Sequence, residues 1–127
     1  MQTNNNKQNT NSKPIYDLEE RLLQFAKKVR LFVRKIKVDE LNKPDMIQLI
    51  KSSGSEGANY IEANESLSKK DFMLRMKISR KEAKESIFWL RILEIYVGKE
   101  NFEEYIEILN EAIELKKILS SIIEKSK

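Results

Sequence analysis

The sequence has no cysteine and no histidine among its 127 residues. The absence of cysteine excludes a disulfide framework, a thiolate metal site and a cysteine nucleophile. The absence of histidine removes the commonest general base and the usual transition-metal ligand. This chain therefore lacks the side chains on which many classes of enzyme depend. We expect a protein that is not an enzyme and that uses no cofactor and no metal.

Glycine, proline and long apolar runs are scarce as well. The chain has three glycines and two prolines, which favours a helical protein. No apolar run approaches the roughly 18 residues of a membrane span, and the first residues lack the apolar segment of a signal peptide. We therefore expect a cytoplasmic protein with no membrane partner.

Charged residues, in contrast, make up 35% of the chain, and the formal net charge is +4.

The first residues, MQTNNNKQNTNSK, are almost wholly polar, and nothing in them could offset the entropy lost on ordering. We expect a disordered polar tail over residues 1–14 and one domain over residues 15–127. The alternative for the tail is a flexible arm that contacts RNA or a partner.

Apolar residues at alternating three- and four-residue steps predict four long helices. We expect them over about 16–37, 44–66, 69–96 and 102–124, with capping pairs at three of the starts. These pairs are Asp17 with Glu20, Ser68 with Asp71, and Asn101 with Glu104. Because the connections are short, the sequence predicts an all-α fold, an antiparallel up-down-up-down four-helix bundle.

The segment SSGSEG at residues 52–57 holds three serines and two glycines, a composition typical of a loop. Ile47, Ile50, Gly54, Gly57 and Ile61 nevertheless keep the helical spacing. We interpret the segment as helix, with its glycines facing a neighbouring backbone. A loop between two short helices is the alternative. A phosphate-binding glycine loop fits less well, because the spacing matches no recognised fingerprint and no strand precedes it.

The third helix carries two apolar rows. The first comprises Phe72, Met76, Ser79, Ala83, Ser86, Leu90, Leu93 and Val97, and the second comprises Leu74, Ile78, Trp89, Ile92 and Tyr96. A helix with two apolar rows needs neighbours on two sides.

Charge is segregated by helix. The first helix (16–37) has a net charge of +4 and the third, counted up to Arg91, has +5, whereas the second (45–66) has −3 and the segment from Lys99 onward has −2. Phosphate contacts rely on such cations. The candidate nucleic-acid-binding residues are therefore Lys27, Lys28, Arg34 and Lys35 in the first helix, and Lys70, Lys77, Lys81, Lys84 and Arg91 in the third. The first and third helices lie on a diagonal of such a bundle, so their cations need not merge into one patch within a monomer, whereas an oligomer could bring them together on one face or around a channel. The alternative is that the cations form solvated faces.

Five polar residues lie in or beside the apolar rows. Ser55, Asn59 and Glu62 share one side of the second helix, and Glu85 needs a partner such as Asn59 or Arg80. We predict a structural polar network that sets helix register or subunit pairing. A carboxylate metal site of the di-iron type is disfavoured because the chain has no histidine.

Several motifs resemble a known family. The run S-x-x-x-N-x-x-E at Ser55 to Glu62, Phe72 after a short polar link, R-K-E-A-K-E ending at Glu85, and W-L at Trp89 resemble the four-helix bundle proteins encoded in intervening sequences of bacterial 23S ribosomal RNA genes. The opening D-L-E-E-R-x-x-x-F-A, over residues 17–26, is similar as well. Ala63 departs from the glycine found there in many members of the family.

The resemblance implies a four-helix bundle that assembles into a homopentamer. It also implies a likeness to the accessory protein of diversity-generating retroelements, a basic pentamer that associates with nucleic acid and a reverse transcriptase.

Our first hypothesis is an oligomer that binds structured RNA, such as ribosomal RNA or a ribonucleoprotein. The second is a protein-interaction scaffold or accessory subunit without nucleic-acid contact. A magnesium-dependent nuclease is a distant third, with the acids Glu62, Asp71, Glu82 and Glu85 available.

Overall fold

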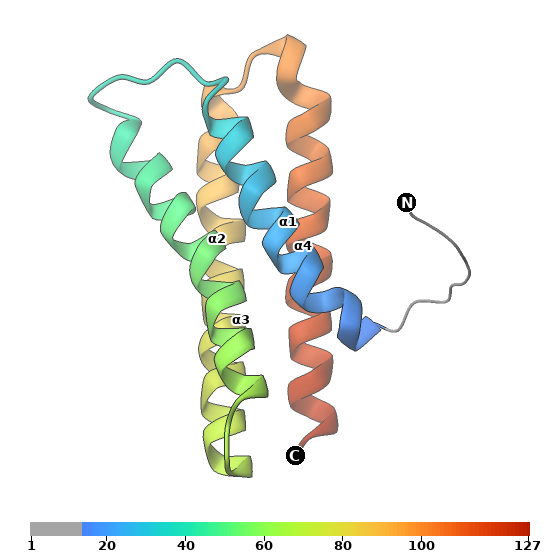
Figure 1. Ribbon diagram of the computed structural model, residues 1–127. Helices are drawn as coiled ribbons and strands as arrows, with labels where there is room; N and C mark the ends of the chain where they lie inside the picture. The colour runs from blue at the N-terminus through green and yellow to red at the C-terminus, as the bar shows by residue number, and fades with distance from the viewer. Residues whose placement is uncertain (1–13) are drawn as a thin grey trace.

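The computed structural model describes the backbone of residues 14–127 and the side chains from Leu18 onward. Four α-helices run alternately up and down the molecule (Figure 1): α1 Pro14–Val33, α2 Lys43–Asn64, α3 Lys69–Leu93 and α4 Phe102–Lys125. Two 3-10 helices, η1 Glu94–Tyr96 and η2 Lys99–Asn101, join α3 to α4. The prediction of an all-α, antiparallel four-helix bundle is confirmed. The predicted tail lies outside the described residues, except at Pro14.

The helices occupy the four corners of the bundle in chain order. α1 packs against α2 and α4, and α3 packs against the same two helices. In Figure 1, α3 lies behind α2, and α4 stands beside α1. α1 and α3 are therefore at opposite corners, as the up-down topology predicts.

The end of α1 differs from the prediction, since the helix ends at Val33 and not near Lys37. The backbone N–H of Lys35 bonds the carbonyl of Phe32 at 2.9 Å, and that of Ile36 bonds the carbonyl of Val33 at 3.1 Å. These three-residue bonds tighten the chain after the last α-helical turn. The tightened turn carries Ile36 into the core, where it is 5% exposed.

The capping predictions have mixed outcomes. Ser68 Oγ accepts a hydrogen bond from the backbone N–H of Asp71 at 3.1 Å, as predicted. Asn101 makes no side-chain cap bond, because its backbone at φ −111° and ψ 6° is not in the extended conformation of a capping residue. Asp17 is no cap either, since α1 begins earlier, at Pro14.

The segment SSGSEG is helical, as predicted, and α2 continues through it without a break. The side of α2 that faces the core is not the predicted one, however. Ile47 and Ile61 of the predicted apolar row are 45% and 43% exposed. The buried residues of α2 are Met46, Leu49, Ser52, Ser53, Glu56, Tyr60 and Ala63.

Small and polar side chains join α2 to α3. The first apolar row predicted for α3 is confirmed, because Met76, Ser79, Ala83, Ser86, Leu90 and Leu93 are buried. Ser86 Oγ donates to Ser52 Oγ at 3.0 Å, and Ser79 Oγ donates to the backbone carbonyl of Glu56 at 2.6 Å. Serine and alanine at this contact satisfy buried polar groups and leave room for the two backbones to approach.

α1 packs on α2 at the glycine positions. A Cβ atom on Gly57 would lie 3.4 Å from Leu22 Cβ, which is ordinary van der Waals contact. Arg30 of α1 adds hydrogen bonds across the contact, from Nη2 to the carbonyl of Ile50 at 3.1 Å and from Nη1 to Ser53 Oγ at 3.4 Å. Gly57 therefore has room for one methyl group and no more.

We expect Gly57→Ala to raise the free energy of unfolding by up to about 1 kcal/mol, because alanine favours helix and its methyl group fits. Gly57→Leu should lower it by about 1–3 kcal/mol, because the longer side chain meets Leu22. Urea denaturation measures both. Glu62→Leu is the control, since Glu62 is exposed on the same helix, and this substitution should change stability little. Equal effects of leucine at the two positions would contradict the close contact at Gly57.

Candidate nucleic-acid interface

Seven exposed residues follow one another along α3 at steps of four and three residues. They form a single stripe, the α3 stripe, made of Lys70, Leu74, Lys77, Lys81, Lys84, Phe88 and Arg91. At 100° per residue the stripe lies on the side of α3 opposite the buried row, so it points away from the core. It includes all five cations that the sequence analysis selected on this helix, and spans about 31 Å at 1.5 Å per residue.

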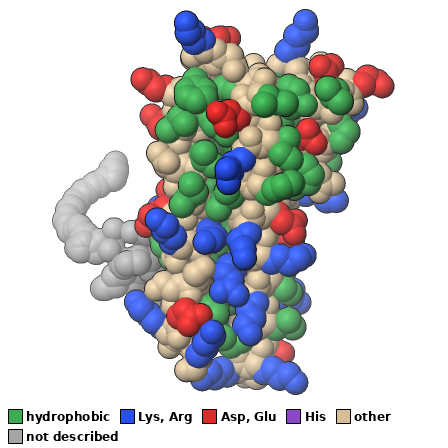
Figure 2. All heavy atoms as spheres, turned by 180° about the vertical axis from the view of Figure 1, so that it is seen from behind, with side chains coloured by type: hydrophobic (Ala, Val, Ile, Leu, Met, Phe, Trp, Pro, Cys, Tyr) green, Lys and Arg blue, Asp and Glu red, His purple; other side chains and the backbone are tan. Residues whose placement is uncertain are grey.

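The middle of the stripe borders a shallow hollow of about 340 Å³. The hollow is lined by Lys77, Arg80, Lys81, Lys84, Glu85 and Phe88. Among the described residues, Lys81 is the only one of these cations in an ion pair, with Glu85 at 3.5 Å. Figure 2 shows Lys and Arg side chains gathered on the lower half of the face seen from behind, with hydrophobic side chains above them. The α3 cations are therefore grouped and mostly uncompensated.

The α1 cations lie elsewhere and face acidic residues. Lys35 Nζ is 2.6 Å from Glu104 Oε1, and Lys28 lines a groove between α1 and α4 together with three glutamates of α4. Lys27 lines a separate groove between α1 and α2, and Arg34 is exposed just beyond the end of α1. The structure thus does not bring the selected cations of α1 and α3 together within one protomer.

Among the five members of the predicted polar network, the described hydrogen bonds and ion pairs join only Asn59 and Ser55. Asn59 donates to the backbone carbonyl of Ser55 at 2.9 Å and accepts from Arg75 at 3.3 Å. Glu62 is exposed. Glu85 is 43% exposed and pairs with Lys81 rather than with Asn59 or Arg80. These residues lie near the edges of α2 and α3, where each one interacts with its own neighbouring side chains or with solvent.

A different polar group is buried in the bundle. Glu56 has no exposed surface, and neither of its carboxylate oxygens has a hydrogen-bond partner among the described residues. Burial raises the pKa of Glu56 to about 8; the nearby Ser86 hydroxyl offsets part of this rise, and the charges of Glu82 and Glu111 add to it. At neutral pH this carboxyl group is therefore mostly protonated and uncharged.

Glu111, one of those charges, is itself neutralised by α1. Arg21 donates to it twice, from Nε at 3.1 Å and from Nη2 at 2.7 Å, which is a bidentate pair.

Within residues 18–127, no group of three or more acidic side chains is arranged to hold a metal ion. None of the described helices combines the length and the apolar character that a membrane crossing requires.

Two notable residues escaped the sequence analysis. Phe88 continues the spacing of the α3 cations, four residues after Lys84 and three before Arg91, so periodicity could have revealed it. Glu56 lies three residues after Ser53 and four before Tyr60, but it sits inside a segment where glycine and serine dominate. The predicted core row of this helix runs through Gly54 and Gly57, so the sequence predicted Glu56 neither as buried nor as exposed.

Comparison with known proteins finds a related solved structure. No family model matches the chain, and no curated protein matches it. The chain is similar to a crystal structure of a protein with unknown function from the S23 ribosomal protein family of Bacteroides thetaiotaomicron VPI-5482. The two share 33% sequence identity with a TM-score of 0.70, and the match covers 84% of this chain and 97% of that one.

We expect the free energy of unfolding to fall as pH rises from about 5 to about 8. Below pH 4.5, Glu56 is neutral in the folded and in the unfolded chain. Above it, the unfolded chain ionises while the folded chain keeps the proton until its pKa of about 8. Unfolding then releases a proton, which destabilises the fold by up to about 1.4 kcal/mol per pH unit. Urea denaturation at a series of pH values measures this slope.

The control separates Glu56 from other titrating groups. Glu56→Gln replaces a neutral acid by a neutral amide, so the slope should flatten and stability at pH 8 should rise relative to the parent. Glu62→Gln, on the exposed side of the same helix, should leave the slope unchanged. An undiminished slope in Glu56→Gln would show that the pH dependence has another source.

Proposed function

Because the chain belongs to the S23 ribosomal protein family, we propose that it is a non-enzymatic RNA-binding bundle that works through the α3 stripe. The observation that carries the proposal is the grouping of exposed cations on α3. Lys70, Lys77, Lys81, Lys84 and Arg91 face solvent on the outermost side of the helix, and Arg80 joins them at the hollow. A line of cations over about 31 Å suits a polyanion better than a small anion.

The contrast between the helices supports the choice of α3. Two cations in and just after α1 pair with acids of α4, Arg21 with Glu111 and Lys35 with Glu104. Such pairs stabilise the contact between the two helices and leave less positive charge for a ligand. In the described part of the chain, one cation of the α3 stripe is in an ion pair, Lys81 with Glu85, and that pair is exposed and long. The net +5 of this helix is thus available to phosphates.

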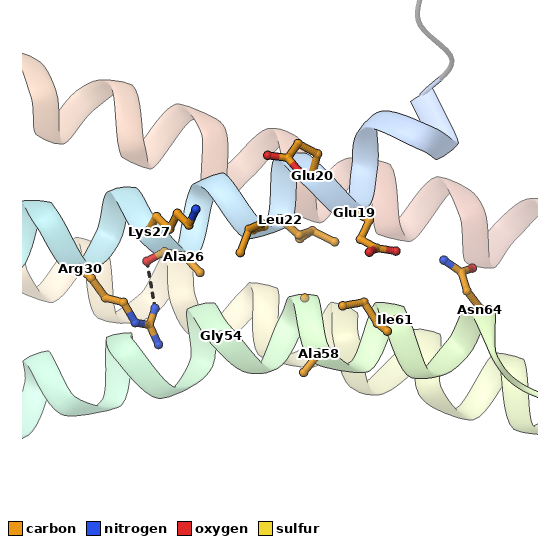
Figure 3. A pocket seen from close by; sticks show the side chains of 12 residues that line it. Glu19, Glu20, Leu22, Ala26, Lys27, Arg30, Gly54, Ala58, Ile61 and Asn64 are labelled. Carbon is orange, nitrogen blue, oxygen red and sulfur yellow. Dashed lines mark hydrogen bonds between the residues drawn. The ribbon is translucent and has the colours of Figure 1, made fainter.

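We also propose that the protein assembles with copies of itself. Two apolar surfaces are only partly covered by the described residues of one protomer. One is a groove of about 790 Å³ between α1 and α2, where Leu23 and Ile61 are 47% and 43% exposed (Figure 3). The other is a flank row made of the half-buried residues Ile78, Trp89 and Ile92 of α3 and Tyr96 of η1. Two different apolar surfaces suit a head-to-tail contact, which closes into a ring when the rotation allows.

The RNA-binding proposal predicts affinity for a ribosomal RNA fragment that falls steeply with salt. Five phosphate contacts would give a slope of log K against log salt of about −4. Filter binding across a salt series measures it. Reversing Lys77, Lys81 and Lys84 to glutamate together should abolish binding. Reversing the exposed Lys37, Lys43 and Lys99 makes the same change in net charge away from the stripe and should reduce affinity much less. A flat salt response would contradict the proposal.

The assembly proposal predicts a mass in solution several times that of one chain, as measured by light scattering. Ile61→Lys places a charge in the groove and should shift the protein toward the monomer. Leu41→Lys is the control, because Leu41 is 75% exposed in the α1–α2 connection and lies outside the groove. A monomeric parent protein, or equal effects of the two substitutions, would count against assembly through this groove.

A further inference from the structure

Phe88 is an exposed aromatic ring within a row of cations. Its side chain is 57% exposed, and it lines the hollow beside Lys77, Arg80, Lys81 and Lys84. A phenylalanine with this much exposed surface is not explained by the core of the protomer. Cations border the ring on the side of the hollow, and Trp89 of the flank row borders it on another side.

The ring is held by its neighbour in the sequence. The Phe88 and Trp89 rings meet edge to face, with centroids 5.1 Å apart and planes at 77°. Trp89 is itself half-buried, so it provides a fixed support. This contact favours one position of the Phe88 ring, which lowers the entropy lost when a flat ligand packs on it.

We propose that Phe88 stacks on an unpaired base of the RNA while the neighbouring lysines contact the flanking phosphates. This inference rests on the proposed RNA-binding function and narrows its ligand to RNA with unpaired nucleotides, such as a loop or a bulge. A nucleotide offers both groups that the hollow can bind, a flat base that packs on the Phe88 ring and a negative phosphate that the lysines contact. A continuous A-form duplex keeps its bases stacked inside and offers no free base to the ring.

A protein partner fits the same surface less well. Covering Phe88 with an apolar protein surface would also remove Lys81 and Lys84 from water, since they line the same hollow. Burying lysine charges without partners is strongly unfavourable. The stacking of a base avoids this penalty because the phosphates accompany the base.

The test compares two RNA probes with equal numbers of phosphates, a hairpin with a pyrimidine loop and a fully paired duplex. Phe88→Ala should weaken hairpin binding by roughly 5- to 100-fold and leave duplex binding nearly unchanged. The salt dependence of hairpin binding should stay as in the parent, because no phosphate contact is lost. Phe88→Leu should behave like Phe88→Ala, whereas Phe88→Trp should retain affinity, because only an aromatic ring can stack.

Leu74→Ala is the matched control. Leu74 lies on the same stripe with the same 57% exposure but has no ring, so its loss should not affect hairpin binding. Equal weakening of hairpin and duplex by Phe88→Ala, or no effect on either, would overturn the stacking inference while leaving RNA binding intact. A change of mass in solution with Phe88→Ala would overturn it in favour of a protein interface. Failure of the parent protein to bind either probe at low salt would remove the proposed function itself.

Discussion

The bundle depends on the close packing of α2 against α3 through small side chains. Ser52 and Ser86 bond to each other, and Ser79 bonds the backbone beside them, so the contact is polar yet satisfied. Small residues permit the two helices to approach closely. At the same level of the bundle, however, a long acidic side chain is left without a free hydrogen-bond donor. That side chain is Glu56. It stays in the core because the neutral acid is far easier to bury than the carboxylate.

The remaining two helices are attached in a different way, and this decides which charges stay free. α1 is held on α2 by van der Waals contact at Gly57 and by Arg30, and on α4 by the pairs Arg21–Glu111 and Lys35–Glu104. Arg21, Arg30 and Lys35 therefore help to hold the bundle. α3 is attached through its uncharged buried row, so its cations take no such part. The cations of the two segments thus have different physical roles.

The sequence predicts the fold well, because helical periodicity is a local signal. The four helices, the continuity of SSGSEG and the buried row of α3 all follow from spacing. The sequence failed where two registers compete on one helix. In α2, the row through Ile47 and Ile61 and the row through Ser52 and Glu56 both fit the spacing, and only the packing on α3 selects the second. Phe88 was missed for another reason, since an aromatic residue on a helix is usually assigned to the core.

The three faces of α3 suggest how assembly and RNA binding can coexist. The buried row, the flank row and the α3 stripe lie at about 180°, 75° and 0° around the helix at 100° per residue. The core covers the first, and another copy packed on the flank row would cover the second. The stripe, opposite the core, would remain open in every copy. Several stripes on one ring would then engage one RNA together, and their combined binding would exceed that of a single stripe without any new contact.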